Sequence, residues 1–205
     1  SWLSDDSGVV FSSHRVTGPE MRVASLRDGS ERHFATLSMP AGKPTLSRDG
    51  RTVAFHSLDA NNKANVWTQL VSGSKPFQVT FDKEFAGYPS WSPDGKWLSY
   101  EVWRGDDIQL AVVPSGGGEP RDLTSGRGLV WSYSWAPDND RIACSVMKDG
   151  AWNLEWISKS TGERKKLTTH GSFRTFVRDP AWSPAGDQLV FEFAETKGNV
   201  FMGEM

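Results

Sequence analysis

Short alternating runs of apolar and polar residues, separated by polar turns, recur along the whole chain. The clearest unit spans residues 89–100, where Ser92-Pro93-Asp94-Gly95 separates two such runs. Pro93 fixes φ for the second position of a tight turn, Asp94 suits the third position, and Gly95 accepts a positive φ. The pattern therefore predicts an antiparallel hairpin.

The hairpin layout occurs five times at a nearly fixed period. Its anchor positions are spaced by 44, 45, 44 and 47 residues and are Trp2, Leu46, Trp91, Trp135 and Trp182. A second marker closes each of the first four repeats 33, 34, 33 and 33 residues after its anchor, as Phe34-Ala35, Val79-Thr80, Leu123-Thr124 and Leu167-Thr168. Two markers that keep the same register indicate a true repeat architecture.

Each repeat is predicted to hold four strands, A to D, and no stretch has a helical apolar period. In the third repeat the expected strands are Tyr88–Ser92, Trp97–Val102, Ile108–Val113 and Arg121–Thr124. In the fourth they are Ser132–Trp135, Arg141–Val146, Trp152–Ile157 and Lys165–Thr168. The fifth ends with strand C at Val200–Met202 and lacks an outer strand.

Four-stranded units of this period, each needing a neighbour to cover an apolar face, are typical of a β-propeller. We expect one all-β domain over residues 1–205, with blades at roughly 1–40, 41–86, 87–130, 131–176 and 177–205. Because strand D of the last blade is missing and nothing precedes strand A of the first, we expect an incomplete ring that residues upstream of Ser1 close in a parent protein.

The repeat resembles the WD40-like PD40 repeat of TolB-type propellers. The resemblance rests on Pro-x-Trp-Ser-Pro-Asp-Gly-Lys at residues 89–96 and on Gly-Gly-Glu-Pro-x-x-Leu-Thr at residues 117–124. It implies a six-bladed parent ring and a periplasmic or secreted location. The same repeat also occurs in prolyl-oligopeptidase-type and tricorn-type peptidases, in oligogalacturonate lyases and in sensor regions of bacterial kinases, so the repeat alone does not select a function.

Composition narrows the function classes. The net charge of −2, from 23 basic and 25 acidic residues, disfavours nucleic acid and anionic membranes as partners. The given sequence has no run of roughly 18 apolar residues, the length that a membrane span needs, and no segment with the pattern of a signal peptide. We therefore expect no membrane insertion. Cys144 is the single cysteine and is expected to be buried.

No constellation of residues signals catalysis, a metal or a cofactor. The four histidines, His14, His33, His56 and His170, have no metal-ligand spacing. No Gly-x-Ser-x-Gly elbow is present. Asp94 and Asp138 are expected to stabilise turns, the run 116–118 to form a hairpin turn, and the anchor tryptophans to pack between blades. We therefore predict no catalytic residue, no metal site and no cofactor.

The B-to-C loops and D-to-A connectors are expected on one face of the propeller, and they carry aromatic residues beside arginines, a composition typical of binding hot spots. The connector from His170 to Arg178 is three residues longer than its equivalents. The candidate binding residues are Phe85, Tyr88, Trp103, Arg104, Trp131, His170, Phe173, Arg174, Phe176 and Arg178.

The leading hypothesis is a non-catalytic propeller that binds a protein or peptide. The first alternative is the propeller domain of a larger enzyme, such as a peptidase or a bacterial protein kinase, whose catalytic domain lies outside this segment. The second alternative is an oligogalacturonate-lyase-like enzyme. It is disfavoured because such lyases use a histidine-rich metal site, whereas the histidines of this sequence have no metal-ligand spacing.

Overall fold

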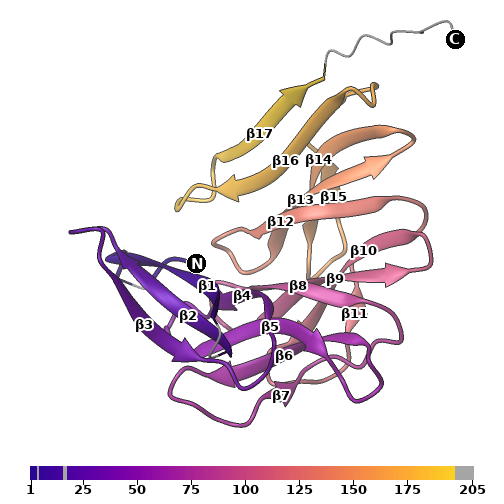
Figure 1. Cartoon of the computed structure of the whole chain (residues 1–205). Helices are drawn as coiled ribbons and strands as arrows, with labels where there is room; N and C mark the ends of the chain where they lie inside the picture. The colour runs from indigo at the N-terminus through magenta and orange to yellow at the C-terminus, as the bar shows by residue number, and fades with distance from the viewer. Residues whose placement is uncertain (4, 16–17, 197–205) are drawn as a thin grey trace, which may run out of the picture.

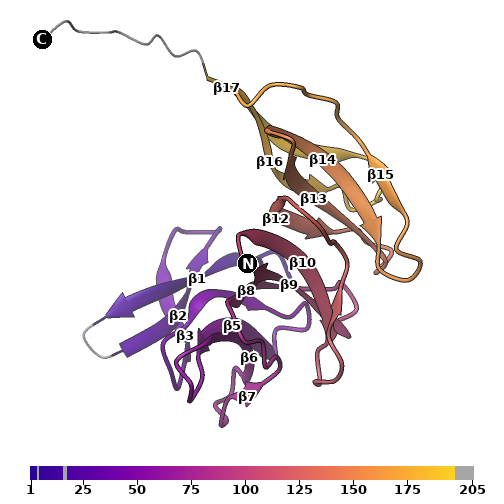
Figure 2. The same cartoon turned by 90° about the vertical axis from the view of Figure 1, so that its right-hand side faces the viewer.

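The computed structural model describes residues 1–3, 5–15 and 18–196, and its regular structure is entirely β. The strands fan out in successive sheets around a common centre close to the N-terminus (Figures 1 and 2). The expected strand C of the fifth repeat, at Val200–Met202, lies outside the described residues.

The strands group into five successive blades along the chain. The first blade holds β1 (Gly8–Arg15), β2 (Gly18–Ser25) and β3 (Glu31–Thr36). The second holds β4 (Gly42–Leu46), β5 (Thr52–Leu58), β6 (Ala64–Leu70) and β7 (Phe77–Gln78). The third holds β8 (Ala86–Trp91), β9 (Trp97–Arg104), β10 (Asp107–Pro114) and β11 (Arg121–Asp122). The fourth holds β12 (Leu129–Trp135), β13 (Arg141–Lys148), β14 (Ala151–Ser158) and β15 (Arg164–Lys166). The fifth holds β16 (Thr175–Trp182) and β17 (Leu189–Glu195).

Within each blade, neighbouring strands pair antiparallel in sequence order, as four-stranded propeller blades do. In the first blade the place of strand A is taken by a single bridge between Trp2 and Val9. One parallel bridge, Ile108 to Leu129, joins the third blade to the fourth. The predicted all-β fold of successive antiparallel blades is thus confirmed, and the described strands do not form a closed ring.

The turn between strands A and B has the predicted chemistry in every repeat. The residue four after the anchor has a positive φ between 55° and 74° in all five repeats: Asp6, Gly50, Gly95, Asn139 and Gly186. In the third repeat the Gly95 N–H donates to the Ser92 carbonyl (2.9 Å) and the Asp94 carboxylate accepts from the Ser92 hydroxyl (2.6 Å). Asp94 is therefore part of the turn, as expected.

The threonine of the closing marker has a structural role that explains its repetition. Its Oγ1 accepts the backbone N–H of strand C over 2.9 Å in three blades, through the pairs Val66–Thr80, Leu110–Thr124 and Leu154–Thr168. The short outer strand leaves that N–H without a ladder partner, so the side chain satisfies it.

The hydrophobic core is divided among the gaps between adjacent blades. Val10 and Met21 of the first blade pack with Val53 and Phe55 of the second. Two further clusters of the same kind lie between the second and third blades and between the third and fourth. Because both faces of a middle blade are covered, its strands are apolar on both faces.

Three of the four anchor tryptophans also join the blades, through a hydrogen bond from the indole Nε1 to the preceding blade. Trp91 donates to the carbonyl of Thr45 (3.2 Å), Trp135 to that of Ser90 (3.3 Å) and Trp182 to that of Ser134 (3.1 Å). The expectation of a packed anchor is wrong for Trp2, which is 61% exposed. No preceding blade is present among the described residues to cover it.

Candidate functional site

The inner strands of blades two to five share an irregularity that the repeat pattern did not reveal. Each has a shift in register, and the residue three before the anchor has a positive φ. These residues and their φ angles are Lys43 (42°), Tyr88 (54°), Ser132 (42°) and Asp179 (50°). A left-handed conformation is costly for a residue other than glycine, and such bulges are concentrated at functional sites, where they redirect side chains.

The four bulges meet around the propeller axis and line one cavity of about 670 Å³. This axial cavity also contacts Glu101, Trp131 and Tyr133. Its volume is in the range of small-ligand and side-chain pockets. Each bulge residue lies three residues before the anchor, within the inner strand and ahead of the turn that joins strands A and B.

The axial cavity is aromatic and carries charges of both signs. Burial raises the pKa of Glu101 to about 7, while Lys43 opposes the shift. Burial also holds the pKa of Tyr133 well above its usual value. The Tyr133 hydroxyl donates to the Tyr88 carbonyl, which joins the fourth blade to the bulge of the third.

A cluster of aromatic rings adjoins the cavity. The Phe85 ring lies 5.3 to 5.4 Å, centroid to centroid, from the rings of His56, Tyr88 and Trp103. The Tyr88 N–H donates to Nδ1 of His56 (3.3 Å). Burial, and secondarily Lys43, lowers the pKa of His56, which keeps its imidazole neutral at pH 7.

Gly42 is required beside His56, and we expect Gly42→Ala to destabilise the chain by about 1–3 kcal/mol, since overpacking displaces buried groups. A Cβ at Gly42 would lie 2.1 Å from Nε2 of His56. Gly116→Ala is the matched control, because a Cβ there meets no atom within 4 Å. Urea unfolding of both variants checks the prediction, and equal midpoints would contradict it.

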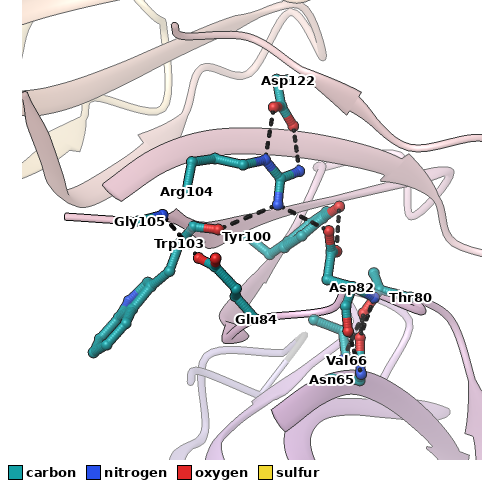
Figure 3. Close-up of polar contacts among 10 residues, drawn as sticks. All are labelled: Asn65, Val66, Thr80, Asp82, Glu84, Tyr100, Trp103, Arg104, Gly105 and Asp122. Atoms are coloured by element: carbon teal, nitrogen blue, oxygen red, sulfur yellow. Dashed lines mark hydrogen bonds and ion pairs between the residues drawn. The ribbon is translucent and has the colours of Figure 1, made fainter. Parts of the chain in front are cut away.

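Arg104, predicted as a binding residue, is held in an ion-pair network (Figure 3). Its guanidinium donates to both oxygens of Asp122 (3.2 and 3.1 Å) and to Asp82 (3.0 Å). The buried Tyr100 hydroxyl donates to the same Asp82 (3.3 Å). Arg104 therefore fastens the third blade to the connector that precedes it, while Trp103, 45% exposed, points away from the network.

The remaining candidates are divided between the cavity and the long connector. Trp131 is 56% exposed at the cavity, with its ring centroid 5.8 Å from that of Trp152. Phe173 is 70% exposed, and the Arg174 guanidinium lies 5.8 Å from the centroid of its ring. The other three are packed or paired: His170 lies against Phe193 (5.7 Å), Phe176 is half-buried, and Arg178 pairs with Glu192 (2.8 Å).

The structure thus brings Tyr88 and Trp131 to the cavity and Phe85 and Trp103 next to it, but leaves the connector candidates apart from it. Sequence reasoning missed the rest of the lining, including the polar residues Lys43, Glu101, Ser132, Tyr133 and Asp179. A usable signal was present, because Lys43, Tyr88 and Asp179 each directly precede a proline at the same place in their repeats.

Two searches cover the described part of the chain only. Within residues 1–3, 5–15 and 18–196, no three His, Cys, Asp or Glu side chains are grouped so that they could hold a metal ion. No helix in the same residues is long and apolar enough to cross a membrane. Cys144 is buried, and burial raises the pKa of its thiol far above the ordinary value.

The chain is similar to bacterial proteins of more than one named type. It is 28% identical to the uncharacterized peptidase YuxL of Bacillus subtilis, with 72% of this chain and 28% of that protein covered. It is 26% identical to a TolB homologue of Chlorobium luteolum, with 78% and 36% covered. The chain therefore spans about a third or less of these relatives' lengths.

The fold comparison agrees with the sequence comparison. A TolB-like structure from Agrobacterium tumefaciens superposes with a TM-score of 0.77 at 21% identity, covering 93% of this chain and 67% of that one. At this identity the likeness concerns the fold alone. The family model described as the TolB beta propeller domain, PD40, matches residues 1–203. This chain therefore belongs to the PD40 family of TolB-type β-propeller domains.

Proposed function

We propose that this propeller is a non-catalytic binding module that takes a peptide or an extended protein segment at its axial cavity. The observation that carries the proposal is the ring of four left-handed bulges around one cavity of about 670 Å³. Strain repeated in four blades at one place is better explained by a shared site than by packing, since a regular strand would pair without it.

The side chains around the cavity suit a peptide. Tyr88, Trp131 and Tyr133 offer aromatic surface with polar ends, and Lys43 and Asp179 offer charges at the rim. Aromatic anchors surrounded by polar groups carry most of the binding energy in protein interfaces. The proposal includes a periplasmic or secreted location for the protein, which the resemblance to TolB-type propellers implies.

The TolB homologue among the relatives supports a binding role. A second candidate function is favoured by the peptidase among the relatives, of which this chain covers 28%. In that reading the same cavity admits or holds a peptide for a hydrolase domain elsewhere in a longer protein. Both candidates require peptide binding at the axis, and they differ in whether the parent protein contains a hydrolase domain.

Peptides selected from a random displayed library against this chain test the axial site. We expect Trp131→Ala to weaken their binding by at least about tenfold, roughly 1.4 kcal/mol, with little change in the unfolding midpoint. Phe77→Ala is the matched control, because Phe77 is 51% exposed in β7 and Trp131 is 56% exposed. Equal affinities for the two variants would contradict the axial site.

The long connector is tested separately with the double substitution Phe173→Ala and Arg174→Ala. If the connector extends the binding face, the same selected peptides lose at least about tenfold in affinity while the unfolding midpoint stays nearly constant. Unchanged affinity would restrict the site to the axial cavity.

A further inference from the structure

Glu101 is a buried carboxylic acid that faces the axial cavity. It is 5% exposed, lies in β9 opposite Gly87 of β8, and lines the cavity. Its carboxyl group forms no hydrogen bond or ion pair with any residue in the described part of the chain. No side-chain oxygen in the described residues is fully buried without a partner, so the Glu101 carboxyl group must reach the open space of the cavity. An acid held in such a largely buried place is costly to ionise unless a cation meets it there.

The equivalent side chains of other blades show how this position is normally satisfied. In the second blade it is His56, whose Nδ1 accepts the N–H of Tyr88 from the next blade (3.3 Å). In the fourth it is Ser145, whose hydroxyl donates to the carbonyl of Val177 in the next blade. Glu101 stands at the same repeat position, but no such side-chain contact joins it to the next blade within the described residues.

The groups that face Glu101 favour a positively charged ligand group. Lys43 is the cation that acts on it, yet the Lys43 ammonium lies over the Tyr88 ring, 5.2 Å from its centroid, and not in an ion pair with Glu101. The aromatic side chains of Tyr133 and Trp131 line the same cavity, and the faces of aromatic rings attract cations. A metal ion would need several oxygen ligands, and the described residues hold no such group.

We propose that the axial cavity binds the ammonium or guanidinium end of a lysine or arginine side chain of the bound peptide, with the Glu101 carboxylate as its ion-pair partner. The peptide in this statement rests on the proposed function. The ion pair also explains why an acidic residue stands at this largely buried position. A cation beside the carboxylate favours its charged form, so the raised pKa of Glu101 returns toward its ordinary value once the cation is bound.

The test uses a probe that needs no peptide partner. Nα-acetyl-lysine amide is titrated into the labelled chain, and binding is followed by the NMR shifts of the Glu101 carboxyl carbon and of the Tyr88 and Tyr133 amides. Nα-acetyl-norleucine amide, which has a side chain of similar length and no charge, is the ligand control. We expect the lysine probe to bind at least about tenfold more tightly and to lower the pKa of Glu101.

Two substitutions complete the test. Glu101→Gln should remove the preference for the lysine probe, whereas Glu192→Gln, at the equivalent position of the fifth blade, should retain it. Equal binding of both probes, or an unchanged preference in Glu101→Gln, would overturn the proposal.

If selected peptides bind at the axis but the chain shows no preference for the lysine probe, the cation site fails and the proposed function stands. If the probe binds as expected but no peptide does, the proposed function fails and the cation site stands.

Discussion

Trp135→Ala should lower the free energy of unfolding by about 3–5 kcal/mol, since it removes a large aromatic ring from a packed site. Trp135 is 7% exposed and belongs to the cluster between the third and fourth blades. Its indole N–H also donates to Ser99 Oγ (2.8 Å), so the substitution deletes a polar contact between blades as well.

Urea unfolding followed by circular dichroism measures this loss. Trp2→Ala is the matched control, because Trp2 occupies the same repeat position but is 61% exposed. Its substitution should change stability by no more than about 0.5 kcal/mol, as surface changes usually do. If both variants shift the midpoint equally, inter-blade packing is not the role of the anchor.

Glu101→Gln should stabilise the chain by about 3 kcal/mol at pH 8 and leave it nearly unchanged at pH 4. The pKa of Glu101 is raised from 4.5 in the unfolded chain to about 7 in the folded one. Between these values the folded state binds more protons than the unfolded state, so wild-type stability falls as the pH rises from 4.5 to 7. Glutamine resembles the neutral acid and has no such penalty.

Stability of the wild-type and variant proteins is measured from about pH 3 to pH 8, and the difference between wild type and variant is the quantity of interest. Glu192→Gln provides a control of opposite sign, because the pairing with Arg178 lowers the pKa of Glu192. Its wild-type contribution is present above pH 4.5 and lost as the pH falls through the lowered folded-state pKa. If the difference in stability between the wild-type and Glu101→Gln proteins does not vary with pH, Glu101 is solvated in the folded chain.

Much of the fold could be predicted from the sequence because short local residue patterns determine its turns and strands, and these patterns recur five times. The turn residues at Ser92-Pro93-Asp94-Gly95 determine the hairpin, and the same positive φ recurs four residues after every anchor. The anchors Trp91, Trp135 and Trp182 could be assigned to inter-blade packing because a large apolar ring repeated in register must be covered by the same neighbour each time.

The candidate site was predicted only in part. The aromatic residues Tyr88 and Trp131 were found because aromatic residues close to the D-to-A connectors are a local signal in the sequence. Arg104 was expected to be available to a partner, yet its guanidinium is held by Asp82 and Asp122, which lie 22 and 18 residues away. An ion pair of that kind depends on where the loops of a blade fold back, and no local pattern encodes this.

By itself, therefore, the sequence determined the repeat, the all-β blades, their turns and their tryptophan contacts, since these follow from residue types at fixed local spacing. Only the tertiary structure decided the axial cavity and the position of Glu101 in its wall. His56, Glu101 and Ser145 occupy one repeat position and are all polar. The next blade supplies a hydrogen-bond partner to the first and the third, but none to the Glu101 carboxyl group within the described residues. That difference arises from how neighbouring blades pack across the axis, which depends on contacts between residues far apart in the chain.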